Sequence, residues 1–215
     1  MTHRTAGIAA VALVAALAGT PAVAADEAPS PAATGWVVEN PSPDGIFATN
    51  EGSVSVVGAG TGVAITCPVL SGWGRADSAT LRPNDFFGET GVTNAGDCTG
   101  PGSAGVEVIS SPGTVFVAET YAAAADRIGG SAYPWLWGLF LEAPDCQVDL
   151  YAVDANAPAP LAYDNATATL EAGPIDVVAT RAEGTGCADL ATVGDRMTFQ
   201  ARLVATPGFT VHPAP

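Results

Sequence analysis

The feature that most constrains the fold is a two-residue alternation of apolar and polar side chains. In the clearest stretch Met197, Phe199 and Leu203 alternate with Thr198 and Gln200. Successive side chains of a strand point to opposite faces, so this pattern predicts strands with one buried face and one face in water. The same pattern recurs at 53–56, 63–67, 106–108, 147–151 and 166–171.

Clusters of Gly, Pro, Asn and Asp separate the alternating stretches, for example at 40–45, 97–102 and 183–186. These residues favour turns, and about ten short strands spaced in this way predict an all-β fold, an antiparallel β-sandwich of Ig-like or related type. Residues 120–130 differ, because helix-forming alanines lie between Thr120 and a glycine pair. This stretch predicts at most one short helix of one or two turns, with a continued strand as the alternative.

Four cysteines brace the expected domain. Cys67 and Cys146 lie on the apolar faces of their strands, whereas Cys98 and Cys187 lie in glycine-flanked loops. Of the three possible connectivities, this succession of strand cysteine and loop cysteine favours Cys67 with Cys98 and Cys146 with Cys187. No Cys-x-x-Cys pair is present, which disfavours a zinc site.

The N-terminus has the three parts of a secretory signal peptide: Arg4, an apolar run over 7–19, and small residues before the expected cleavage after Ala24 or Ala25. The apolar run has about 13 residues, and a membrane span needs about 20, so no membrane insertion is expected after cleavage. We expect a signal peptide over 1–24, a disordered Ala- and Pro-rich leader over 25–34, and a folded domain over 35–215. Two tandem disulfide-closed units, about 35–130 and 131–215, remain an alternative. The expected location is extracellular, where disulfides persist.

The composition is strongly acidic. The chain has 22 carboxylates and no lysine, and six arginines follow the signal peptide, so the mature chain carries a net charge of −16. Such a charge repels nucleic acids and anionic membranes. We therefore expect an extracellular or cell-envelope partner and no nucleic acid.

Several of these features occur together in one known group. The export signal, the Ile65-Thr66-Cys67 strand, the Cys98-Thr-Gly-Pro-Gly102 loop, the Pro134-Trp135 segment and two later cysteines resemble the small secreted four-cysteine β proteins of high-GC Gram-positive bacteria. The resemblance covers about 62–203. It implies secretion, an all-β fold and sequential disulfides, and it implies no particular activity.

The sequence identifies no catalytic residue, no cofactor and no metal site. His212 is the one histidine after the signal peptide, no Gly-x-Ser-x-Gly elbow is present, and lysine chemistry is impossible. Carboxylates at Asp145, Asp149 and Asp176 leave a carboxylate-based hydrolase open. Asp154 to Asn156 and Asp164-Asn165 offer oxygen atoms for calcium, but turn formation is the favoured reading for both.

The most unusual stretch is Tyr133-Pro-Trp-Leu-Trp-Gly-Leu-Phe-Leu141. As one strand it places Tyr133, Trp135 and Trp137 on one face, either as part of a buried core strand or as an aromatic ligand-binding wall. The sequence therefore predicts a secreted, non-enzymatic binding or surface-associated protein. The alternatives are an extracellular carboxylate-based hydrolase and a carrier of an apolar small molecule.

Overall fold

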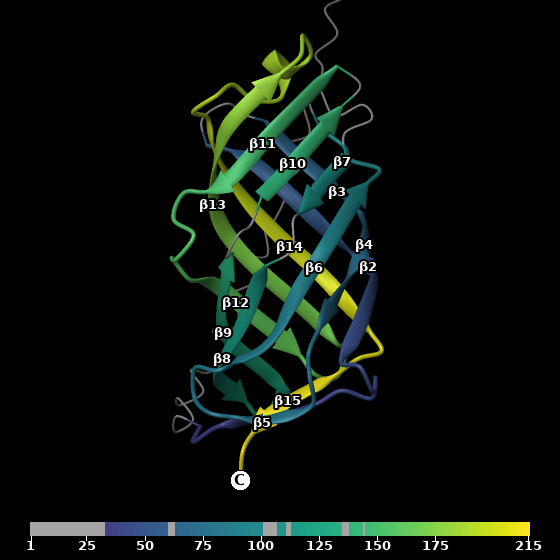
Figure 1. The fold of residues 1–215 in the computed structure, drawn as a ribbon, viewed down its shortest axis with the longest axis vertical. Helices are drawn as coiled ribbons and strands as arrows, with labels where there is room; N and C mark the ends of the chain where they lie inside the picture. The colour runs from purple at the N-terminus through teal and green to yellow at the C-terminus, as the bar shows by residue number, and fades with distance from the viewer. Residues whose placement is uncertain (1–32, 60–62, 101–106, 111–112, 135–137, 144) are drawn as a thin grey trace, which may run out of the picture.

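The computed structural model describes residues 33–59, 63–100, 107–110, 113–134, 138–143 and 145–215 (Figure 1). These residues form an all-β structure of antiparallel sheets with two disulfides, which confirms the predicted fold class. The strands are β1 (Trp36–Glu39), β2 (Ile46–Gly58), β3 (Ala64–Cys67), β4 (Val69–Arg75), β5 (Ala79–Leu81), β6 (Phe86–Gly96), β7 (Glu107–Ser110), β8 (Thr114–Ala122), β9 (Arg127–Pro134), β10 (Gly138–Ala143), β11 (Cys146–Ala152), β12 (Ala159–Asp164), β13 (Thr169–Glu183), β14 (Arg196–Thr206) and β15 (Thr210–Pro213).

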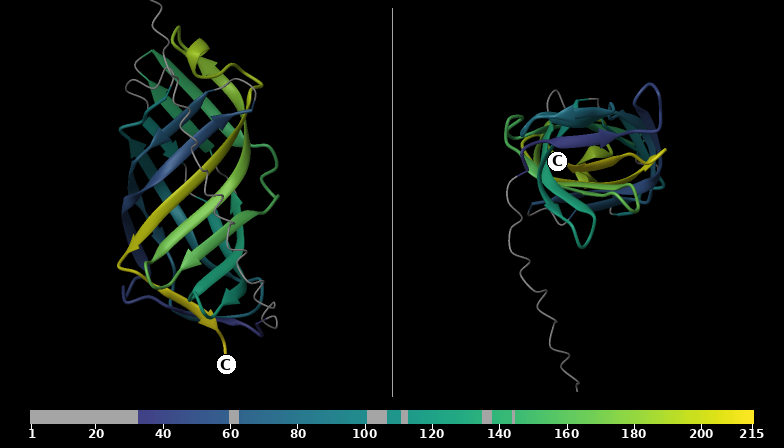
Figure 2. Two further views of the ribbon diagram at one scale, coloured as in Figure 1. Left: turned by 180° about the vertical axis from the view of Figure 1, so that it is seen from behind. Right: turned by 90° about the horizontal axis from the view of Figure 1, so that it is seen from below.

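The larger sheet combines hairpins of consecutive strands with pairings between strands far apart in the chain, and it closes on itself in two circuits. In the upper half of Figure 1, backbone pairing runs β11-β10-β7-β6-β4-β2-β14-β13 and returns to β11. In the lower half it runs β8-β6-β4-β2-β14-β13-β12-β9 and returns to β8. The view from below shows a flattened outline, in which two walls face each other as the layers of a sandwich do (Figure 2). Among the described strands, each member of a circuit therefore has a neighbour on both sides, which protects the sheet from edge-to-edge association.

The two circuits share β2, β4, β6, β13 and β14 but not the remaining strands. β7 and β8 follow each other along the chain, as do β9 and β10, and β11 and β12; the first strand of each pair belongs to one circuit and the second to the other. Stretches of chain that could form one strand are thus divided into two strands, and β3 and β4 are divided in the same way. The number of strands therefore exceeds the ten that the sequence predicts.

The core fills the space between the walls. Val56, Ile65, Leu141, Val148 and Tyr163 are all 0 % exposed, and they come from strands of both circuits. One hydrophobic cluster contains residues from both sides of residue 130. Full burial of large side chains stabilises by about 1.5–3 kcal/mol each, so this cluster supplies the main driving force for folding.

A three-stranded sheet, ordered β15-β1-β5, covers the lower end of the closed sheet (Figure 2). Its Trp36 is buried, and Phe209 next to β15 stacks on Tyr163 with ring centroids 4.5 Å apart. The Tyr163 hydroxyl donates a hydrogen bond to the Phe209 carbonyl at 2.6 Å, and burial raises the pKa of Tyr163. The C-terminal strand is thereby fastened to the core.

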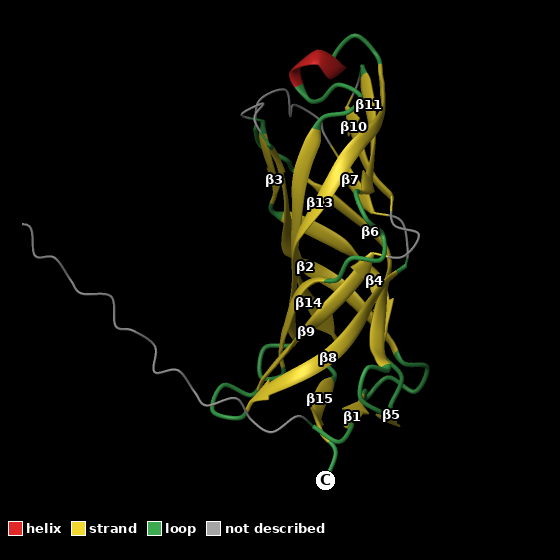
Figure 3. Ribbon diagram, turned by 90° about the vertical axis from the view of Figure 1, so that its left-hand side faces the viewer, coloured by secondary structure: helices red, strands yellow, loops and turns green. Residues whose placement is uncertain are grey.

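The disulfides join Cys67 to Cys98 and Cys146 to Cys187, as predicted. Cys67 and Cys146 are buried strand residues, also as predicted. Cys98 follows β6, and Cys187 begins the 3₁₀ helix η1 (Cys187–Asp189), which lies at the upper end of the molecule (Figure 3). Each disulfide links a strand to a loop that comes much later in the chain, at sequence separations of 31 and 41 residues.

The helical turns expected within residues 120–130 are absent, and the strand alternative is correct. β8 continues to Ala122, a turn over 123–126 follows, and β9 begins at Arg127. Glycine permits this hairpin, because a Cβ atom at Gly130 would collide with the Val117 carbonyl. A helix of this length is marginal alone, so pairing between β8 and β9 prevails. No helix in the described part of the chain is long and apolar enough to cross a membrane.

Candidate functional site

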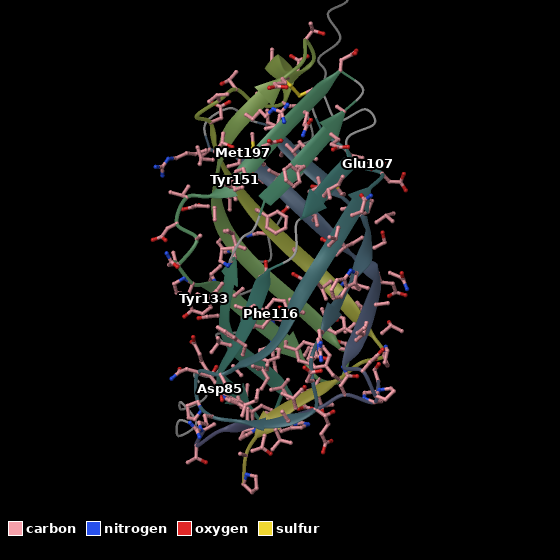
Figure 4. All side chains as sticks on the ribbon, in the orientation of Figure 1. Asp85, Glu107, Phe116, Tyr133, Tyr151 and Met197 are labelled. Atoms are coloured by element: carbon pink, nitrogen blue, oxygen red, sulfur yellow. A yellow bond between two sulfur atoms is a disulfide. The ribbon has the colours of Figure 1, made fainter. Side chains whose placement is uncertain are left out.

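The predicted aromatic stretch 133–141 is divided between two strands. Tyr133 lies in β9, half-buried on the outer surface, whereas Leu141 in β10 is buried in the core. The two residues therefore lie on opposite faces, in contrast to the single strand expected from the sequence. Trp135 and Trp137 lie outside the described residues. Figure 4 labels Tyr133 together with the inward-facing Phe116.

The acidic residues considered as calcium ligands form hydrogen bonds to the backbone of their own turns. Asp154 Oδ1 accepts a hydrogen bond from the Asn156 backbone N–H at 2.9 Å, and Asp164 Oδ1 accepts one from Thr167 N–H at 2.8 Å. These are the side-chain-to-backbone bonds that favour Asp in turns. Within the described ranges no cluster of three or more His, Cys, Asp and Glu side chains could hold a metal ion.

His212 lies in β15 at the lower end of the molecule, with its Nδ1 3.7 Å from Asp126 Oδ1. Tyr121 O–H and Asn165 Nδ2–H donate hydrogen bonds to the same carboxylate oxygen, and Asn165 also bonds to the Val211 backbone in both directions. Donation by Asn165, followed by that of Tyr121, holds the pKa of Asp126 below its usual range. The cluster fastens β15 to two turns.

The outer surface of β4, β6 and β8 differs from its surroundings, and we name it the aromatic face; it contains Trp73, Phe86, Val92 and Val115. Trp73 is 45 % exposed, and Phe86 and Val92 are exposed to a similar degree. Trp73 lies over Gly91: a Cβ atom at Gly91 would be 2.5 Å from Cδ2 and Cζ2 of the indole. A residue larger than glycine would therefore displace the ring.

A hollow of about 330 Å³ opens on the aromatic face. Leu81, Phe86 and Val115 form its apolar part. Tyr133 is the cross-strand partner of Val115 on the neighbouring strand, but it is not one of the residues that line the hollow. The volume falls at the lower end of the range found for small-molecule sites.

Charged groups also line the hollow. Arg75 Nε donates to both carboxylate oxygens of Asp77 at 2.9 and 3.0 Å, and this bond raises the pKa of Arg75. Glu89 is the cross-strand partner of Arg75 and lines the same hollow. The site thus offers one cation and two anions beside an apolar surface.

On the opposite wall, whose strands face the viewer in the left panel of Figure 2, the outer surface of β2, β3, β13 and β14 carries another hollow of about 290 Å³. We name this surface the polar face, because Ser53, Ser55, Thr66, Gln200 and Arg202 line it. None of the described residues that line this hollow is aromatic. The interior cavity between the walls has about 30 Å³, room for a water molecule or two and too little for an apolar ligand of ordinary size.

Trp73 is not among the residues predicted above, although its neighbours in the sequence carry a signal. Within Ser71-Gly-Trp-Gly-Arg75, alternate residues are glycine, and the other face of the strand carries Ser, Trp and Arg. That combination indicates an outward tryptophan, because the polar neighbours share its face. Gly74 faces inward beneath the Phe47 ring, which confirms this orientation.

Comparison with known proteins adds nothing to this description: no protein-family model, no curated protein and no solved structure matches the chain. The resemblance to secreted four-cysteine β proteins therefore remains a prediction. The functional interpretation depends on the geometry of the two outer faces.

Proposed function

We propose that this chain is a secreted, non-enzymatic binding protein that binds its ligand on the aromatic face. The observation that supports this most strongly is the hollow of about 330 Å³ lined by Leu81, Phe86 and Val115. Phe86 is 45 % exposed, and a ligand that covers such a side chain gains about 25 cal/mol for each Å² of apolar surface removed from water. Among the described residues the close-packed core leaves far less space, so the ligand is expected on the outside.

The charged groups of the hollow favour binding over catalysis. Arg75 and Asp77 neutralise each other, because the Arg75 Nε–H is shared between both carboxylate oxygens of Asp77, and such a charged pair can orient polar groups of a ligand. The predicted export signal and the two disulfides support a role outside the cell.

A carboxylate-based hydrolase is the second candidate, because Asp77 and Glu89 line the same hollow. Paired carboxylates are the acid and base of most glycosidases. Under this alternative Glu89→Gln abolishes turnover of a chromogenic glycoside; under the binding proposal the wild-type protein turns over none.

A fragment screen by two-dimensional NMR tests the binding proposal and does not require the ligand to be identified first. Fragments are expected to shift the backbone amides of Arg75, Glu89 and Val115, and Phe86→Ala should remove these shifts. Val193→Ala is the matched control, because Val193 is 65 % exposed and lies in a loop away from the hollow. Shifts confined to the polar face would overturn the proposal.

A further inference from the structure

The Trp73 ring is held as a flat plate on the sheet. Its fused-ring atoms lie over Gly91, so one face of the indole is covered and the other faces solvent. On one side Trp73 pairs with Ala48 of β2, and on the other side the β4–β6 register shifts between Gly72 and Gly74, so Trp73 and Gly91 lie at an irregularity of the ladder between two regularly paired stretches. A plate of this kind needs no rearrangement to accept a flat ligand.

Polar groups lie at both ends of this plate. On one side Ser71 and Asn94 are cross-strand partners, and on the other side Arg75 and Glu89 are. All four are exposed, and together they present hydroxyl, amide, guanidinium and carboxylate groups. Asn94 Nδ2 lies 3.5 Å from Glu107 Oε2, at the limit of a hydrogen bond, so a ligand hydroxyl competes easily for either group.

The chemistry that fits an aromatic plate with donors and acceptors at its edges is that of a pyranose ring. A pyranose with equatorial hydroxyls has C–H groups on its flat faces, which pack on the negative face of an indole, and hydroxyls around its edge. The hydroxyls are then directed toward the groups beside the plate, where each can donate and accept.

Other ligand classes fit less well. An extended peptide adds to a sheet through a free strand edge, whereas β4 pairs with β2 and β6, and β6 pairs with β8 up to Thr90 and with β7 from Thr93. Nucleic acids and acidic polysaccharides are repelled by the mature net charge of −16. Of these ligand classes, an uncharged ligand therefore fits the aromatic face best.

We infer that the aromatic face binds a neutral oligosaccharide of pyranose rings with equatorial hydroxyls, with one ring stacked on Trp73 and the chain continuing toward the hollow at Phe86. This inference rests on the proposed function and specifies its ligand. Gly91 and Phe86 belong to the same strand and lie about 16–17 Å apart at the rise of an extended strand, which exceeds one sugar ring. Arg75 and Glu89 lie between the plate and the hollow, and both line the hollow.

The test is an NMR and calorimetric titration of the mature protein with three probes: cellohexaose, xylohexaose and N,N′-hexaacetylchitohexaose. At least one probe should shift the Trp73 indole N–H and the amides of Arg75, Glu89 and Asn94. Trp73→Ala should weaken its binding at least tenfold, and Asn94→Ala should weaken it severalfold. An oligogalacturonate of the same length should not bind.

Two further variants separate the stacking surface from general effects. Gly91→Ala retains the indole but displaces it, and should weaken binding at least fivefold. Tyr151→Ala is the matched control, since Tyr151 is 44 % exposed but lies in β11, and should leave affinity unchanged. Melting curves show that each variant is folded.

If no probe shifts Trp73, or if Trp73→Ala leaves affinity unchanged, the saccharide assignment is overturned. If the fragment screen still identifies the hollow in that case, the proposed binding function stands and only the ligand class is wrong. If neither fragments nor saccharides reach the aromatic face, both proposals fail.

Discussion

The aromatic face and the polar face are two outer surfaces of one closed sheet, and the same hydrophobic core lies behind both. Their inward residues are alike: Val54 and Leu203 behind the polar face are as apolar as Leu70 and Phe116 behind the aromatic face. Their outward residues differ, with serine, threonine and glutamine on one side and the exposed Trp73, Phe86 and Val92 on the other. Inward positions are selected for packing, so outward positions carry the information about function.

The largest expected effect separates the inward and outward phenylalanines of the aromatic face. Phe116 is 1 % exposed and Phe86 is 45 % exposed. Phe116→Ala should lower the free energy of unfolding by about 3–5 kcal/mol, because it removes a buried ring and leaves a cavity. Phe86→Ala should cost only about 1 kcal/mol. Urea denaturation with the disulfides intact measures both, and equal losses would show that Phe86 is a core residue, not a ligand-binding one.

A smaller effect distinguishes the glycines of the two faces. Gly173 in the polar face has φ 108°, and a Cβ atom there would lie 2.7 Å from the Phe199 carbonyl oxygen. Gly173→Ala should therefore cost about 2 kcal/mol, since backbone must move. Gly91→Ala should cost only about 1 kcal/mol, because the obstructing Trp73 ring can turn toward solvent.

Thermal melting of the two glycine variants checks this order, and the tryptophan near-ultraviolet circular dichroism should change for Gly91→Ala but not for Gly173→Ala. The reverse order of stability would mean that the Trp73 ring cannot turn aside to make room and is packed as tightly as a core side chain.

The smallest expected effect is the dependence of the melting temperature on pH. It should not distinguish the two faces, because the carboxyls responsible lie outside both. Hydrogen bonds from Asn165 to Asp126, and from the Thr167 backbone to Asp164, lower the pKa values of both carboxyls. A carboxyl with a lowered pKa stabilises the fold above its unfolded value, near 4, and this contribution is lost as the pH falls through the folded value. Between pH 7 and 5 the melting temperature should hardly change, and relief of repulsion among the 22 carboxylates can raise it slightly.

Below pH 4 the melting temperature should fall. Asp126→Asn should make this fall less steep, and it should lower the stability at pH 7. Both turns lie outside the two faces, so ligand binding should not follow the same curve. A large loss of stability between pH 7 and 5 would reveal ionised carboxylates that hold the fold by other means.

Local patterns predict the strands well, and long-range pairing decides the rest. The alternation at 197–203 predicts β14 correctly, because one face of that strand packs on the core. The helix expected at 120–130 fails, since Tyr121 pairs with Ile128 across a hairpin, a contact that helix propensity does not include. Sheet closure depends on the registers of β11 with β13 and β6 with β8, which no local pattern encodes.

For the candidate site too, local patterns predict some features and long-range pairing decides the others. The cysteine pairing is predictable, because strand alternation already distinguishes inward Cys67 from loop Cys98. The direction of Tyr133 is not, since β9 ends at Pro134 and β10 begins at Gly138. Trp73 is predicted to face outward by its glycine neighbours, but the ring's position over Gly91 depends on the register of β4 with β6.

The most direct measurement compares two double variants, one for each face, in a single NMR titration with the same fragments and saccharides. Trp73→Ala/Phe86→Ala removes the aromatic face, and Ser55→Ala/Gln200→Ala truncates the polar face to the same number of positions. The ligand-induced shifts should disappear in the first variant and persist unchanged in the second. Shifts that persist without Trp73 and Phe86, or that disappear without Ser55 and Gln200, would contradict the assignment of binding to the aromatic face.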